Sequence, residues 1–137
     1  MQAMVTLPDL AWGGVGIVFA TLFAEPDGAG YSDDGYTTPH EAERQALDQL
    51  DLYERWEQEG RIRIIRSRGH LERHLTAWAS DGVVGAVILM EGADPIVAVD
   101  DLDVWWDRGV RIVGPAWQRT RYSGGSGAPG GLTAEAS

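Results

Sequence analysis

The chain has 137 residues, of which 44% are hydrophobic, so it is long enough and apolar enough for one ordinary domain with a buried core. Its formal net charge of −10 argues against a nucleic acid or an anionic membrane as partner, because both require a basic surface. It contains no cysteine, which excludes disulfides and cysteine-based zinc sites, and no apolar run approaches the ~18 residues of a membrane-spanning helix.

The first half of the chain predicts a buried strand, a loop and a long helix. Residues 15–24 are almost continuously apolar, which is typical of a strand covered on both faces in a parallel sheet. Residues 25–38 are rich in turn formers and predict a loop. Thr38 and Glu41 have the spacing of a capping box, and apolar residues then recur every three or four positions until Gly60, so a helix is expected between them.

The second half predicts further strands in alternation with short helices. Residues 61–67 alternate Arg with Ile, which indicates a half-exposed strand, and residues 69–80 predict a short helix. Residues 83–90 are apolar throughout and predict a second buried strand. A short helix is expected over residues 100–108, and a third buried strand over residues 110–117.

The glycine-rich tail, residues 123–137, predicts a loop. Its first part, residues 123–131, is similar in composition to a phosphate-binding loop, but the lysine of such a loop is missing, so a flexible active-site loop or a plain linker is expected. Ahead of the tail, strands alternate with helices, which indicates βα units around a parallel sheet. A single α/β domain over residues 1–137 is therefore expected.

Glu91 follows the apolar strand at residues 83–90 directly and is itself followed by Gly92. A buried carboxylate costs several kcal/mol unless it is paired, hydrogen-bonded or bound to a metal. Either the strand has reached solvent at Met90, or Glu91 has a function. Because ligands of α/β proteins bind at the carboxyl ends of parallel strands, Glu91 is the first candidate functional residue.

Two other groups of residues have side chains that can bind metals, but their spacing does not match known zinc or calcium motifs. His70 and His74 share one helix face, but zinc-protease motifs place a Glu next to one histidine and Glu72 is adjacent to neither, so two exposed histidines on a surface helix are expected. A cluster of acids lacks the spacing and central glycine of a calcium loop and is expected to favour a helix N-terminus instead; its members are Asp94, Asp100, Asp101 and Asp103.

The six tryptophans occur mostly at helical or strand spacing and are expected in the core. Trp117 is the exception, because it follows the third buried strand at the end where α/β proteins bind ligands. It is therefore the second candidate functional residue.

Several segments together resemble the membrane (renal-type) dipeptidases, peptidase family M19. The most specific are "GAVILMEGADPI", "WWDRGVRIVGPAW" and "GGLTAE", which are similar to a strand ending in Glu-Gly, a "GVR" entry into the next strand, and a "GLT" segment. The stretches "VTLPDLAWGGVGIVFATLF" and "YTTPHEAERQALDQLDLYERW" are similar to the strand and long helix that come earlier in the family. The resemblance covers nearly the whole chain.

The resemblance implies a (β/α)8 barrel of the metal-dependent hydrolase type, with two zinc ions, that hydrolyses dipeptides and related amides. It implies that Glu91 is the carboxylate bridging the two metals and that Trp117 contacts the substrate, in the place where the family usually has a histidine. Residues 15–24, 83–90 and 110–116 would then be the second, third and fourth barrel strands. Residues 61–67 would lie outside the barrel.

The chain also departs from the family. No His-x-Asp pair of metal ligands precedes residue 15, and the family's later zinc histidines would fall beyond residue 137. A barrel of this type needs about 250 residues. The chain is therefore expected to be a partial barrel covering roughly strands 2–4, with at most weak zinc binding.

The sequence thus predicts a zinc-dependent dipeptidase by resemblance, represented by an inactive partial chain of bacterial, cytoplasmic type. The expected partners are a dipeptide substrate and either a second copy of the chain or a complementary fragment. The alternative is a small non-catalytic α/β module that binds a ligand or partner through its glycine-rich tail.

Overall fold

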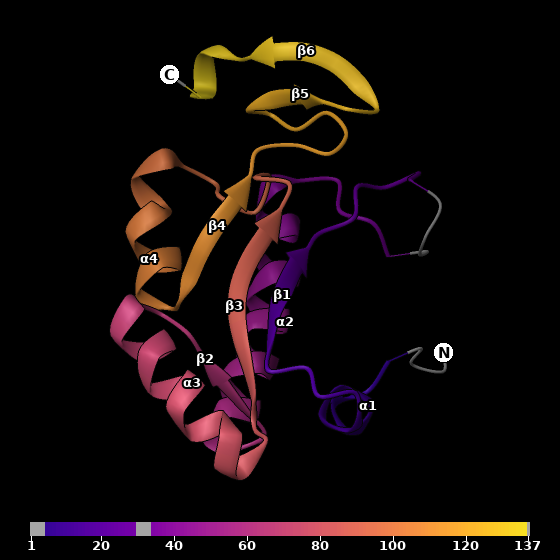
Figure 1. Cartoon of the computed structure of the whole chain (residues 1–137). Helices are drawn as coiled ribbons and strands as arrows, with labels where there is room; N and C mark the ends of the chain where they lie inside the picture. The colour runs from indigo at the N-terminus through magenta and orange to yellow at the C-terminus, as the bar shows by residue number, and fades with distance from the viewer. Residues whose placement is uncertain (1–4, 30–33, 137) are drawn as a thin grey trace.

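A parallel sheet of four strands forms the centre of the computed structural model, which describes residues 5–29 and 34–136. The strands are β1 (Ile17–Phe23), β2 (Ile62–Ile64), β3 (Val84–Glu91) and β4 (Val110–Gly114). β3 pairs with β1 along one edge. Its other edge is shared, because β2 pairs with its first half and β4 with its second half (Figure 1). The prediction of an α/β chain with a parallel sheet is confirmed.

Helices alternate with the strands from β1 onward as predicted, and one further helix precedes β1. They are α1 (Leu7–Trp12), α2 (Pro39–Gln58), α3 (Arg68–Asp81) and α4 (Leu102–Asp107), with 3-10 turns η1 (Val99–Asp101) and η2 (Ala134–Ala136). None of the described helices has the length and apolarity that crossing a membrane requires. The tail differs from its prediction: it forms an antiparallel hairpin of β5 (Ser123–Gly125) and β6 (Ala128–Leu132) rather than a loop.

The long helix α2 begins at the predicted capping box. The Glu41 N–H donates to Thr38 Oγ1 at 3.3 Å, and the Thr38 N–H donates to Glu41 Oε2 at 3.1 Å. These bonds satisfy backbone donors that the first helical turn leaves without partners. Gly60 follows the last turn with a φ of 71°, which favours glycine at a helix end. Local sequence therefore sets both ends of α2.

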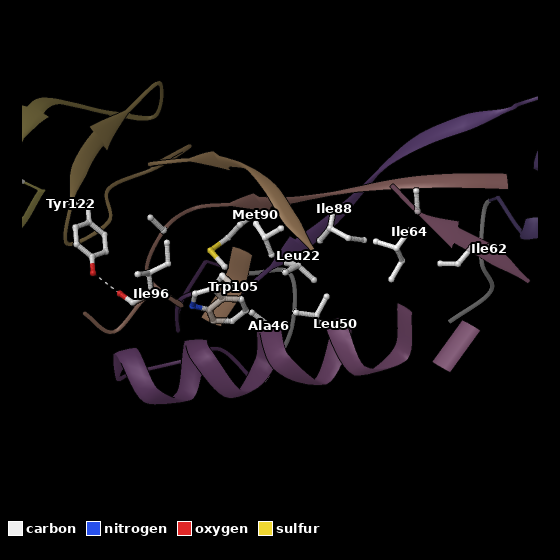
Figure 2. Packing of buried hydrophobic residues seen from close by; sticks show 13 residues of the cluster. Leu22, Ala46, Leu50, Ile62, Ile64, Ile88, Met90, Ile96, Trp105 and Tyr122 are labelled. Carbon is white, nitrogen blue, oxygen red and sulfur yellow. Dashed lines mark hydrogen bonds between the residues drawn. The ribbon is translucent and has the colours of Figure 1, made fainter. Parts of the chain in front are cut away.

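The hydrophobic core lies between α2 and one face of the sheet (Figure 2). Alternate residues of β3 point into it, and so does Leu22 of β1. The residues of this layer that are fully shielded from solvent are Leu22, Ala46, Leu50, Ile88 and Met90. Burying each large side chain among them contributes roughly 1.5–3 kcal/mol, so this layer accounts for much of the driving force for folding.

The opposite face of the sheet is open where β1 and β4 were predicted to be covered on both faces. Phe19 of β1 is 63% exposed and Ile112 of β4 is 44% exposed. Phe19 pairs in register with Val87, and Ile112 with Leu89, so these side chains share one face. The prediction of burial on both faces is correct only for most of β3. No described element covers this apolar face at Phe19 and Ile112.

The packing tests two further predictions. The half-exposed strand expected outside the barrel at residues 61–67 is present as Ile62–Ile64, but it pairs with β3 in the same sheet and both isoleucines are buried. The tryptophans are not mainly in the core either. Among them only Trp105 is fully buried, whereas Trp12, Trp106 and Trp117 are exposed.

Candidate functional site

A small hollow of about 40 Å³ opens at the carboxyl ends of the strands, at the upper end of the sheet in Figure 1. Three segments form its walls: the end of β1 with the loop to α2, the end of β3 with the residues after it, and the residues that follow β4. They contribute Phe23, Pro26 and Tyr36; Glu91, Asp94 and Pro95; and Trp117, Gln118 and Arg119, among others. The hollow thus lies where ligands of parallel α/β sheets bind.

Glu91 is the last residue of β3 and lies in register between Phe23 of β1 and Gly114 of β4. Its side chain is exposed, so the strand has reached solvent and the carboxylate is not buried. Within residues 5–29 and 34–136, the Glu91 carboxylate forms no hydrogen bond or ion pair. Its negative charge at the rim of the hollow is therefore available to a ligand.

Trp117 lines the same hollow and is 47% exposed. The structure thus brings the two candidate residues of the sequence, Glu91 and Trp117, to one place. The hairpin holds the Trp117 backbone, because the Gly127 N–H donates to the Trp117 carbonyl at 3.2 Å. A side-chain carbon at Gly125 would lie 2.3 Å from that carbonyl oxygen, so only glycine allows this approach. The glycine-rich tail therefore positions one wall of the hollow.

Asp94 connects the three walls. It is 7% exposed and lies in the wall that follows β3. Its Oδ2 accepts the Tyr36 hydroxyl at 2.5 Å, and its Oδ1 accepts the Arg121 N–H at 2.8 Å. The Arg121 side-chain Nε lies 3.7 Å from the same Oδ1. Asp94 thereby links the β1–α2 loop to the segment after β4, a role that its place in an acidic cluster did not indicate.

Tyr36 and Arg121 are held firmly around Asp94. Burial, together with the hydrogen bond to Asp94 and its charge, raises the pKa of the Tyr36 phenol well above its usual value. The Arg121 guanidinium donates to the carbonyls of Ile96 at 2.7 Å and Val97 at 3.2 Å. Tyr36 is 58 residues from Asp94 in the sequence, so no local pattern identifies this contact.

The described residues do not form a complete zinc site. Among them, no three His, Asp or Glu side chains are grouped so that they could hold a metal ion. Protein zinc sites use three or four ligands. Glu91 fits the carboxylate of such a site, but Asp94 beside it is already engaged by Tyr36 and Arg121. The ligands that Glu91 would need are not supplied by this part of the chain.

The structure also places the other candidate metal ligands, the acidic cluster and the histidines of α3. Asp101 accepts the Ala98 N–H at 3.1 Å at the start of η1, so it stabilises a helix N-terminus as expected. The prediction of two exposed histidines on α3 is wrong. His74 is 2% exposed and His70 is half-buried.

Searches of protein-family models and of curated proteins found no match to this chain. A search of solved structures found a similar chain described as the crystal structure of dipeptidase AC, a metallopeptidase of family M19. The TM-score is 0.72, the sequence identity is 22%, and the match covers 98% of this chain but 42% of the dipeptidase chain. The chain therefore has the fold of part of a family M19 metallopeptidase and spans less than half the length of that relative.

Proposed function

We propose that this chain carries one part of a zinc-dependent dipeptidase site, built on roughly strands 2–4 of a (β/α)8 barrel. On this assignment β1, β3 and β4 are successive barrel strands. The helices pack against the outer face, and the open face with Phe19 and Ile112 points to the barrel interior. The fold shared with a family M19 structure supports this arrangement.

The observation that carries the proposal is the position of Glu91. Glu91, whose carboxylate has no partner among the described residues, stands at the end of the central strand, beside a hollow whose lining includes the aromatic side chains of Phe23, Tyr36 and Trp117. Parallel α/β proteins place their catalytic and ligand-binding groups at this end of the strands. We assign Glu91 as a metal ligand and Trp117 as a wall of the substrate site.

The size of the hollow decides where a dipeptide would lie. The hollow is small, at about 40 Å³, so we place a dipeptide at its mouth and not fully inside it. It would rest across the mouth, against the exposed face of Trp117. The Trp117 ring offers apolar surface to a side chain there, and the Glu91 carboxylate lies on the same rim.

A dipeptidase of this kind needs metal-bound water as its nucleophile, and zinc supplies that chemistry when bound. Since Glu91 is one ligand where three or four are required, the isolated chain is expected to bind zinc weakly and to hydrolyse no dipeptide. Tight zinc binding and dipeptide hydrolysis both require further ligands from a longer polypeptide or from a partner.

The test is to locate weak metal binding on the chain by nuclear magnetic resonance. Co²⁺, a paramagnetic substitute for zinc, should broaden the amide signals of Gly92 and Trp117. Glu91→Ala should abolish this broadening, whereas Glu135→Ala, a matched change at another exposed Glu, should leave it unchanged. Broadening centred elsewhere, or unaffected by Glu91→Ala, would remove Glu91 from the site.

Turnover is measured in parallel with the dipeptide Gly-Leu in the presence of zinc. The expected result is no hydrolysis above the Glu91→Ala control. Zinc-dependent hydrolysis by the unchanged chain would show that it holds a complete site, and the partial-barrel assignment would then be wrong.

A further inference from the structure

A second concavity, of about 340 Å³, lies between the end of β2 and α3, away from the hollow beside Glu91. We name it the α3 groove. One wall is the end of β2 and the residues after it, with Arg63 and Arg66, and the other is α3 (Figure 1). Glu57 of α2 is the one acidic side chain in its lining. In a chain with a net charge of −10, this concentration of basic groups is unusual.

The α3 wall presents a single face of the helix. His70, Arg73, His74 and Ala77 all line the groove, and their spacing of three and four residues places them in one row. The Arg73 side chain forms no hydrogen bond or ion pair with any residue in the described ranges. The two arginines of the opposite wall are different, because Arg66 pairs with Glu57 at 2.7 Å and Arg63 pairs with Asp81. Arg73 is thus the cation of the groove whose charge is not balanced.

His74 supplies a second, independent sign of a missing ligand. Its Nε2 lies 2.8 Å from the Gly16 carbonyl, so this nitrogen carries the proton and donates it. The absence of a side chain at Gly85 makes room for the ring, since a Cβ there would lie 2.7 Å from Nε2. The remaining nitrogen, Nδ1, is buried and has no hydrogen-bond partner in the described part of the chain. Leaving a buried polar atom unpaired is costly, so a partner for Nδ1 is expected.

The hydrogen-bonding needs of the two side chains differ. Arg73 has only donors, so its ligand must offer acceptor oxygens. With the proton on Nε2, His74 Nδ1 is an acceptor, so its ligand must offer a hydrogen. His70 adds a further donor, because its Nδ1 accepts the Arg66 N–H at 3.4 Å and its proton then lies on Nε2. A carboxylate meets the needs of the donors alone. A phosphate group that keeps one proton meets both.

We infer that the α3 groove binds a phosphate group, with Arg73 and His70 donating to its oxygens and His74 Nδ1 accepting its remaining proton. A metal ion is not the expected ligand, because Arg63, Arg66 and Arg73 would repel a cation. The ligand is either inorganic phosphate or a small phosphate monoester, since both carry this chemistry.

The experiment is a titration of the full chain with inorganic phosphate, followed through the ring ¹⁵N signals of its histidines. Phosphate should shift the His74 Nδ1 signal with saturation. Arg73→Gln should weaken the affinity about tenfold, the loss expected for one charge-assisted hydrogen bond. Arg68→Gln is the matched control: it removes the same charge from the same helix, but Arg68 is exposed, pairs with Glu72 and does not line the groove. It should change the affinity less than twofold.

Titrations with other anions test whether the ligand must carry a proton and whether it is a free ion or a monoester. Sulfate is the same size but carries no proton near neutral pH, so it should bind more weakly than phosphate. Tighter binding of glycerol phosphate would identify a monoester as the ligand, and tighter binding of inorganic phosphate would identify the free ion. The inference is overturned if phosphate does not shift the His74 signal, if sulfate binds equally well, or if Arg68→Gln weakens binding as much as Arg73→Gln.

Discussion

Replacing Asp94 with Ala removes the carboxylate that links the three walls of the hollow. Two donors lose their acceptor, the Tyr36 hydroxyl and the Arg121 backbone N–H. The Arg121 guanidinium, whose Nε lies 3.7 Å from Asp94 Oδ1, loses its ion-pair partner. The guanidinium stays in place, because the Ile96 and Val97 carbonyls still bind it. The variant therefore leaves a partly buried positive charge without its counter-charge.

The magnitude follows from the burial of the pair. Asp94 is 7% exposed, so solvent does not compensate for its loss. Its removal leaves two hydrogen-bond donors, the Tyr36 hydroxyl and the Arg121 backbone N–H, without an acceptor, at about 1–3 kcal/mol each. Tyr36→Phe removes one hydrogen bond to the same charged group and should cost about 1.5–3 kcal/mol. Against a total stability of roughly 5–15 kcal/mol, both changes are measurable.

The assay is urea unfolding followed by circular dichroism, with the free energy of unfolding compared among variants. Asp48→Ala is the matched control, because Asp48 is exposed on α2 and has no partner among the described residues. It should stay within about 0.5 kcal/mol of the unchanged chain. If Asp94→Ala also stays within that range, the three walls do not depend on Asp94 and the reasoning fails.

Three further predictions concern the sheet and the loop. Gly85→Ala should destabilise the chain by about 1–3 kcal/mol through overpacking against His74, whereas Gly131→Ala, with open space around it, should be neutral in the same unfolding assay. The open apolar face should make the chain self-associate at micromolar concentration, and Phe19→Asp should reduce this in light scattering after size exclusion; a monomeric unchanged chain would contradict it. Because the pKa of Tyr36 is raised above about 10, the stability it contributes is present below pH 10 and is lost as the pH rises further, so unfolding measured from pH 8 to 11 should show a steeper loss in the unchanged chain than in Tyr36→Phe.

Features set by neighbours in the sequence were predictable. The capping box of Thr38 and Glu41 lies within four residues, and the apolar run of β3 needs no knowledge of its partners. The meeting of Glu91 and Trp117 at one hollow followed from a general rule, since Glu91 ends β3 and Trp117 lies shortly after the end of β4 in a parallel sheet. The sequence could place these elements because each one obeys a local or topological constraint.

Features set by distant partners were not predictable from pattern. The bond between Tyr36 and Asp94 joins two loops, and neither residue stands in a periodic segment. The hairpin of β5 and β6 is paired through backbone groups of glycine-rich strands, which have no alternation of side chains to reveal it. His74 is buried because Gly85 leaves room for its ring and the Gly16 carbonyl pairs with its Nε2. Both glycines lie outside α3, so the pattern of the helix does not indicate this burial.

The pairing of every other sheet strand with β3 also fixes the order in which the sheet can form. β1 and β2 have no strand partner among the described residues until β3 is available, since Ile17 pairs with Gly85 and Ile62 with Val84. On a ribosome, which delivers the chain from its N-terminus, β1 must therefore wait through the synthesis of α2, β2 and α3. A chaperone that binds extended apolar segments would find β1 free throughout that interval, and parallel strands so far apart in sequence pair slowly.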